Sequence, residues 1–212
     1  PDRAEVTAGQ DILAKGTWLG INDWGVVAGV LNRPETLGTK ANKRSRGELP
    51  LEALDHAEAA IASKELCSID PSSYQPFNLI IADRTDAYWL SSSGGNALVS
   101  ASSIPVGLSM ITAFNLNDET SPRIRYYKPK FETTTPPDVE IGDWNTWKKL
   151  MGDRRETQKG LEVESMTIVS NNGLETVSSS LIALPAEGRD AKPQWLFAPG
   201  RPDINAYKNI VF

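Results

Sequence analysis

The chain has 212 residues, with 22 Lys and Arg against 27 Asp and Glu, and a formal net charge of −5 at pH 7. This acidic balance argues against a general nucleic-acid binder, because that function needs a dense basic surface to displace counterions. No run reaches the roughly twenty apolar residues of a membrane helix, and the first residues do not form an export signal. We therefore expect one soluble domain in the cytoplasm, with no membrane span and no nucleic-acid partner.

The chain contains one cysteine, Cys67, and one histidine, His56. A single cysteine rules out an internal disulfide and a CxxC metal pair, and a single histidine leaves no His-rich ligand set. A Ser-His-Asp triad is disfavoured because His56 lies between charged residues of a predicted helix, where surface placement is the simpler interpretation. We predict no metal site and no cofactor.

Two apolar runs near the N-terminus, residues 17–21 and 26–31, flank a turn at residues 22–25. This turn has Asn and Asp early and Gly last, which is common hairpin chemistry, so the pattern predicts a β-hairpin. The second run ends in Asn32 and Arg33. An amide and a guanidinium at the end of a buried strand suit the binding of a carbonyl or carboxylate. A strand that simply ends in turn residues has the same sequence, and the residues alone leave both interpretations open.

Residues 49–66 carry apolar side chains at helical spacing, and Ser45 with Glu48 forms a capping-box pattern before them. The pattern predicts one continuous helix over 49–66. Cys67 follows it as a small apolar residue, and we expect it to pack rather than to react.

The rest of the chain is rich in predicted strands. These are residues 77–83, 87–91, 97–100, 104–109, 164–168, 175–184 and 194–198, of which the first two form a second hairpin. Residues 115–137 are predicted as a charged, proline-bearing loop with one ordered stretch at 123–127. An amphipathic helix is predicted over 143–151, with its tryptophans in the core. This order predicts an α+β fold with mainly antiparallel sheets.

Several of these segments together resemble the NRDE family, also called the transport-and-Golgi-organisation type 2 proteins. The matching segments are residues 8–11, 16–22, 30–34, 44–49, 77–79, 107–109 and 176–181. The resemblance implies an N-terminal-nucleophile hydrolase type of fold, a four-layer αββα sandwich of two antiparallel sheets between helices. It also implies a single domain over residues 1–212 that lacks its first strands, because the Met-Cys start and the Asn-Arg-Asp-Glu motif of the family do not occur before Pro1. A catalytic cysteine would then lie outside this chain.

The first hairpin also resembles that of choloylglycine-hydrolase-type amidases. The resemblance implies that Asn32 donates to the oxyanion of a tetrahedral intermediate and that Asn22 shapes the turn. A second asparagine expected after residues 107–109 is replaced by Met110, which weakens the enzyme interpretation. The residues expected around a ligand are Trp18, Asn22, Asn32, Arg33, Arg46, Asn78 and Ser109.

Three functions of different classes remain open. The favoured one is a carrier that binds a hydrophobic small molecule, for which the resemblance suggests a tetrapyrrole such as haem, held as cargo and not as a cofactor. The alternative is an amidase that cleaves non-peptide C–N bonds with an N-terminal cysteine. The third is a protein with only an interaction role.

Overall fold

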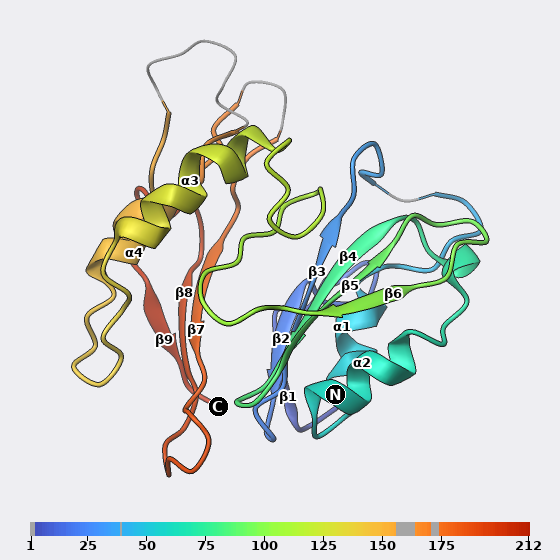
Figure 1. Cartoon of the computed structure of the whole chain (residues 1–212), viewed down its shortest axis with the longest axis horizontal. Helices are drawn as coiled ribbons and strands as arrows, with labels where there is room; N and C mark the ends of the chain where they lie inside the picture. Colours follow the sequence, from blue (N-terminus) through green and yellow to red (C-terminus); the bar gives the residue numbers. More distant parts are fainter. Residues whose placement is uncertain (1–2, 39, 156–163, 171–173) are drawn as a thin grey trace. The chain divides into compact units, whose positions relative to one another are not determined.

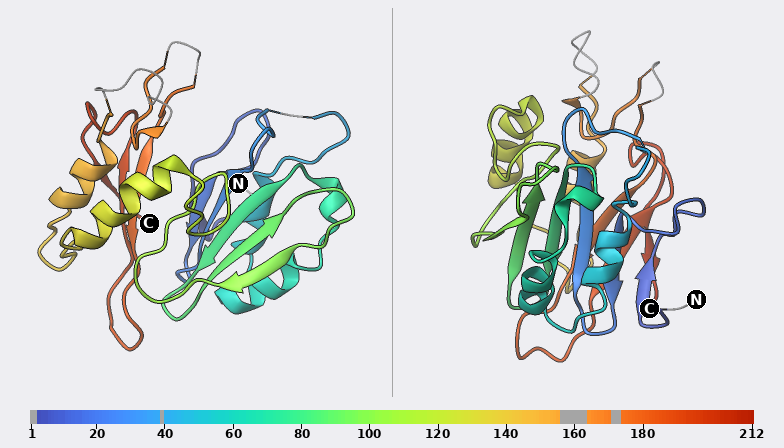
Figure 2. Two further views of the ribbon diagram at one scale, coloured as in Figure 1. Left: turned by 45° about the horizontal axis from the view of Figure 1, so that its top comes forward. Right: turned by 90° about the vertical axis from the view of Figure 1, so that its right-hand side faces the viewer.

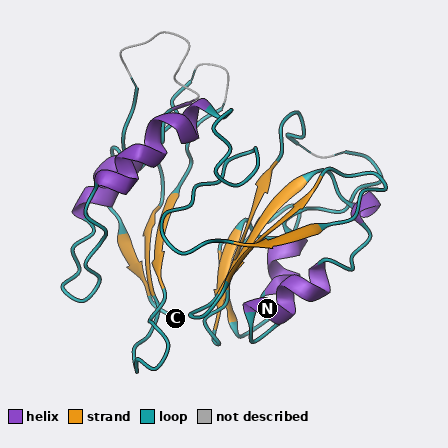
Figure 3. Cartoon of the chain, in the orientation of Figure 1, coloured by secondary structure: helices purple, strands orange, loops and turns teal. Residues whose placement is uncertain are grey.

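The computed structural model describes residues 3–38, 40–155, 164–170 and 174–212. Contacts divide the chain into two compact units: residues 1–118 with 186–189 and 212 form unit 1, and residues 119–185 with 190–211 form unit 2. Figures 1 and 3 show that each unit combines a sheet with helices. The model is therefore mixed α+β, and both of its sheets are antiparallel, as predicted.

Unit 1 contains a six-stranded sheet in which the strands follow one another in chain order. Its strands are β1 (Val6–Ala8), β2 (Leu19–Asn22), β3 (Val27–Asn32), β4 (Phe77–Ala82), β5 (Ala87–Ser92) and β6 (Ser100–Ser103). The hairpin predicted first is confirmed, since β2 pairs with β3 and Leu19 lies opposite Gly29. Gly25 has a φ of +86°, a left-handed conformation that glycine adopts without steric cost.

The second predicted hairpin is also confirmed, with β4 and β5 in register from Phe77 opposite Ser92 to Ala82 opposite Ala87. The next part of the prediction was wrong. Only β6 forms where two short strands were expected, and residues 97–99 and 104–109 lie outside strands.

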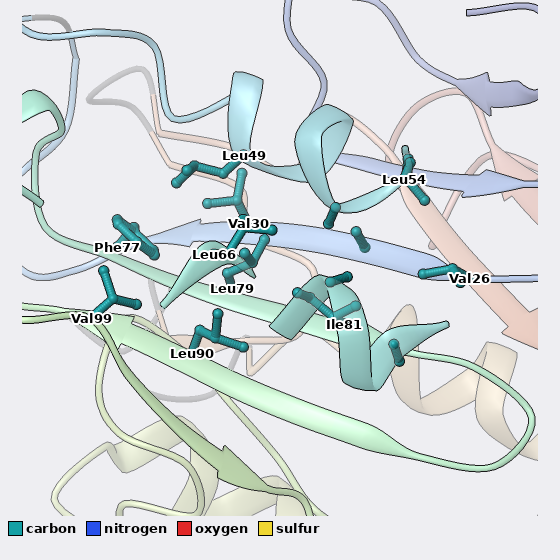
Figure 4. Close-up of a cluster of buried hydrophobic side chains, with 14 of the residues drawn as sticks. Val26, Val30, Leu49, Leu54, Leu66, Phe77, Leu79, Ile81, Leu90 and Val99 are labelled. Carbon is teal, nitrogen blue, oxygen red and sulfur yellow. The ribbon is translucent and has the colours of Figure 1, made fainter. Parts of the chain in front are cut away.

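One face of this sheet forms the main core together with helices α1 (Glu48–Ala53) and α2 (Ala59–Leu66), followed by a 3₁₀ turn at Pro71–Ser73. Side chains alternate along a strand, so Ala28 and Val30 share this face of β3, and Leu79 and Ile81 share that of β4. Each is at most 5% exposed. Figure 4 shows Val30, Leu79 and Ile81 converging between the helices and the sheet, and Figure 2 shows both helices on the same face.

The single helix predicted over 49–66 is wrong, because the chain breaks it between α1 and α2. In a continuous helix the carbonyls of Leu54 and His56 would accept hydrogen bonds from N–H groups four residues later. Here both carbonyls accept from the side-chain amide of Asn22, at 2.9 and 2.7 Å. Glu58 is extended, with φ −137° and ψ 136°. The capping box is also absent, since Gly47 is the N-cap of α1 and makes no side-chain cap bond.

Asp83, just after β4, binds the start of α2. Its Oδ2 accepts from the Ala59 N–H at 2.7 Å, and its Oδ1 accepts from the N–H groups of Thr85 and Asp86 at 2.8 Å. Burial raises the pKa of Asp83, but these backbone donors and the nearby Arg84 outweigh burial, and the net effect lowers the pKa. A β-hairpin loop thus caps a helix that lies far away in sequence.

Unit 2 contains the strands β7 (Ser179–Ala183), β8 (Gln194–Ala198) and β9 (Lys208–Ile210), which form a three-stranded sheet in that order. Strand β8 was predicted correctly, β7 is shorter than predicted, and β9 was not predicted. Residues 164–168 form no strand. Helix α4 (Asn145–Met151) confirms the predicted short helix, and the preceding Trp144 packs in a core with Leu181 and Leu196.

Helix α3 (Pro122–Thr133) overturns the prediction of a loop over 115–137. The Ser121 hydroxyl accepts from the Ile124 N–H, and proline follows in the first turn, which is a favourable helix start. Ile124 and Tyr127 are fully buried. Pro129 lies inside the helix and lacks the N–H of an ordinary turn. This proline and the dense charge hid the helical periodicity. None of the described helices is long and apolar enough to cross a membrane.

The Asp83 cap predicts an acid-sensitive contribution to stability. Because the folded-state pKa is lowered, the contribution is complete above the unfolded pKa and is lost as pH falls through the folded pKa. The free energy of unfolding of wild type minus that of Asp83→Asn should shrink as the pH falls from about 5 to about 2, measured by urea denaturation. Asp86→Asn is the matched control in the same loop and should not show this change. A wild-type advantage over Asp83→Asn that stays constant with pH would contradict the assignment.

Candidate functional site

Asn22 lies at the end of β2 and is 2% exposed. Its Oδ1 accepts from the Val26 N–H at 2.9 Å, which closes the hairpin turn, while its Nδ2 donates to the helix-break carbonyls described above. Both polar atoms of the Asn22 side chain are therefore hydrogen-bonded to the backbone. Asn22 shapes the turn, as the resemblance implied, and has no free group to offer a ligand.

Asn32 lies at the opposite end of the hairpin, as the last residue of β3. Its Cα partner is Phe77 on β4, and strand alternation places its side chain on the same face as Val30, the face that α1 and α2 cover. The Oδ1 of Asn32 is buried and has no hydrogen-bond partner. An unpaired buried polar atom costs about 1–3 kcal/mol, so this amide is a group that a ligand could complete.

Arg33 and Asn78 form the centre of a polar network on the face of the sheet opposite the Asn32 side chain, because Asn78 pairs with Leu31 and alternates with the core residues of β4. Arg33 donates to Asn78 Oδ1 at 2.7 Å and to Asn115 Oδ1 at 2.9 Å, and the Trp89 indole N–H donates to the same Asn78 oxygen at 3.1 Å. The Asn78 Nδ2 donates to the carbonyls of Thr112 and Phe114 at 3.0 and 2.8 Å. Asn78 is fully buried, and this network uses its whole amide.

Arg46 is a buried cation, 6% exposed, that precedes α1. It donates to the hydroxyl and the carbonyl of Thr36, both at 2.8 Å, and to the carbonyl of Pro76 at 3.0 Å. Burial lowers the pKa of Arg46. Pro76 directly precedes Phe77, so these bonds hold the loop after β3 against the start of β4. Arg46 therefore has a structural role next to the strand end.

The hydrogen-bond acceptors of Arg33 and Arg46 are all neutral within the described residues. Both guanidinium groups bind amide, hydroxyl or backbone oxygens, and within the described residues neither pairs with a carboxylate. A cation with only neutral acceptors keeps its attraction for an anion. Two guanidinium groups without carboxylate partners, among the described residues, thus lie near the end of β3 in a chain of net charge −5.

The remaining predicted residues are more dispersed. Trp18 is 49% exposed, and its carbonyl accepts from the Val30 N–H at 2.9 Å, which places its backbone near the same end of β3. The Ser109 hydroxyl accepts from the Asn117 amide at 3.2 Å, and Asn117 Oδ1 accepts from the Met110 N–H at 2.8 Å.

The structure thus brings Arg33 and Asn78 into direct contact on the face of the sheet opposite the Asn32 side chain, and it places Asn22 at the other end of the hairpin. Sequence reasoning missed Trp89 and Asn115, which complete the network. The only available sign was that Trp89 follows Asn78 on the next strand of a predicted hairpin, which does not fix the register.

Metal binding and thiol chemistry gain no support at this site. Among the described residues, no group of three or more His, Cys, Asp or Glu side chains is placed to hold a metal ion. Cys67 is the C-cap of α2, and burial raises the pKa of its thiol. A thiol with a raised pKa is a weak nucleophile at neutral pH.

The comparisons with known proteins give one family. The model of the family described as Transport and Golgi organisation 2 matches residues 1–190. No curated protein matches the chain.

The bonds of Asn22 predict a stability defect when its amide is removed. Asn22→Ala leaves the Val26 N–H and the carbonyls of Leu54 and His56 without partners, and we expect it to lower the free energy of unfolding by about 2–4 kcal/mol. Urea denaturation measures this loss. The matched control is Asn96→Ala, at an exposed position, which should change stability by less than about 0.5 kcal/mol. Equal stabilities of the two variants would contradict the role assigned to Asn22.

Proposed function

Since the chain belongs to the Transport and Golgi organisation 2 family, which confirms the family predicted from its motifs, we propose that it binds and carries a hydrophobic small molecule with an anionic group, such as haem. The ligand binds at the end of β3, around Asn32 and Arg33. A cytoplasmic location is part of the same proposal, and the free thiol of Cys67 fits a reducing compartment.

The single observation that carries this proposal is the state of the Asn32 amide. Asn22 and Asn78 belong to the same sheet, and the fold uses both ends of each of their amides. Asn32 differs from them, because its Oδ1 is buried with no partner. A polar group that the fold leaves unsatisfied at a cost is a reasonable place for a ligand to bind.

Charge supports an anionic ligand. The guanidinium of Arg33 is adjacent to Asn32 in sequence and is held in place by two amide oxygens rather than by a carboxylate. A carboxylate of the cargo, such as a propionate of haem, would supply the missing negative charge. The half-exposed Trp18 at the same strand end offers apolar contact area for the rest of the molecule.

The mode of binding is that of a carrier. Cys67, His56 and Met110 each have a local structural explanation, so we assign none of them as an axial haem ligand. Contacts through shape and carboxylates are weaker than a bond to iron, and such a complex releases its cargo readily.

We also propose that the two units form one domain over residues 1–212 with the four-layer αββα arrangement. Each unit separately supports this proposal. In unit 1, α1 and α2 pack on one face of the six-stranded sheet, and in unit 2, residues in and next to α4 pack against the three-stranded sheet. A single domain should unfold in urea in one cooperative transition. The fluorescence of Trp89 and of Trp195, each in a single-tryptophan variant, reports this transition. Two separate transitions would contradict it.

The second candidate function is an N-terminal cysteine amidase. The position of Asn32 favours it, because the amide N–H groups of an asparagine at the end of a strand are suited to stabilise an oxyanion. The nucleophile would precede Pro1 in the native protein. N-terminal sequencing of the native protein tests this, and a native chain that does not start with cysteine would eliminate the mechanism.

Replacing Asn32 separates ligand binding from stability. Asn32→Leu removes an unsatisfied buried amide, so the free energy of unfolding should stay within about 0.5 kcal/mol of wild type or rise. Loss of one hydrogen bond to the ligand should weaken haemin binding about tenfold, measured by absorbance titration. Asn96→Leu is the control variant and should bind like wild type. Unchanged haemin affinity in Asn32→Leu would rule out the proposed site.

A further inference from the structure

Unit 1 contains a cavity of about 370 Å³ that is separate from the Asn32 group. Its lining residues come from β1, from the loop before β2 and from α1. They are Arg3, Val6, Ala8, Gly9, Gln10, Lys15, Gly16, Thr17 and Leu51. None of the residues predicted to bind a ligand is among them, and the proposed carrier function does not use this cavity.

The loop that forms one wall is closed by Asp11. Its Oδ1 accepts from the N–H groups of Leu13 and Ala14, both at 2.9 Å. Its backbone carbonyl accepts from the Lys15 N–H and its own N–H donates to the Gly16 carbonyl, both at 2.8 Å. The loop therefore has a fixed shape, and Lys15 is held at a φ of +62°, which is uncommon for a residue with a side chain.

Close backbone contact anchors the same loop to the start of α1. A Cβ on Gly16 would lie 2.5 Å from the Gly47 carbonyl carbon, so only glycine fits this position. The Thr17 N–H donates to the Gly47 carbonyl at 2.8 Å. These contacts fix the wall of the cavity before any ligand binds, which reduces the entropic cost of binding.

The charges of the lining residues are of one sign. Arg3 and Lys15 line the cavity and no acidic side chain does. Arg3 forms a bidentate pair with Asp55, at 2.7 and 2.8 Å. Lys15 has no hydrogen bond or ion pair from its ammonium group within the described part of the chain. A rigid loop thus presents an uncompensated cation at the edge of the cavity.

The remaining wall of the cavity is apolar, because Val6, Ala8 and Leu51 are aliphatic. A cation on one side and aliphatic side chains on the other match a molecule with a carboxylate and a short hydrocarbon part. We propose that this cavity is a second ligand site, for a small aliphatic carboxylate whose charge pairs with Lys15 and whose chain packs on Val6 and Leu51. This site is independent of the proposed function at Asn32.

Hexanoate is a suitable probe, with 1-hexanol as its neutral counterpart, and binding to the whole protein can be followed by amide chemical shifts. Hexanoate should shift the signals of Gly9, Gly16 and Thr17, and hexanol should bind at least about fivefold more weakly. Lys15→Gly removes the ammonium and suits the left-handed backbone, so the fold is retained. This variant should bind hexanoate about fivefold more weakly than wild type.

Lys64→Ala is the matched control, since it removes the same charge from an exposed position on α2 and should bind like wild type. Equal binding of hexanoate and hexanol, or equal weakening in both variants, would overturn the charge pairing. Absence of shifts at Gly9, Gly16 and Thr17 would overturn the site itself. The Asn32 proposal would survive either result, because its own test uses haemin.

Discussion

The side-chain amide of Asn22 joins the first hairpin to the helix pair of unit 1. It accepts from the turn at Val26 and donates to the carbonyls of Leu54 and His56, where it ends α1 and redirects the chain. Asp83, directly after β4, then fixes the start of α2. The break between α1 and α2 lets the apolar residues of both helices pack on the same face of the sheet.

Hydrogen-bond satisfaction separates the buried asparagines of this sheet into two kinds. Asn22 and Asn78 are fully engaged and act as fixed points, one at each end of the hairpin region. Asn32 is the exception, with a buried oxygen that the fold does not pair. We propose that a ligand relieves this cost, and that Arg33, whose hydrogen-bond partners are neutral, attracts an anion at the end of the same strand.

The features that could be predicted from the sequence are those that depend on residues close together in the chain. The turn at residues 22–25 predicted the first hairpin, and two β-rich runs around a short polar loop predicted the second, because hairpin contacts are short in sequence. The helix over 49–66 was wrong because its break depends on Asn22 and Asp83, which lie 32 and 24 residues from their partners. For the site, Arg33 and Asn78 were both expected near a ligand, and they do meet. Arg46 instead holds a loop through the Thr36 hydroxyl and two backbone carbonyls, which composition does not reveal.

The central claim is that Asn32, and neither of the two satisfied asparagines, contacts the cargo. Side-chain amide NMR signals of Asn22, Asn32 and Asn78 can be followed while diamagnetic gallium protoporphyrin is added to the protein. We predict that the Asn32 amide pair shifts in proportion to binding and that the Asn22 and Asn78 pairs stay in place. Saturable porphyrin binding with no change at Asn32 would contradict the account.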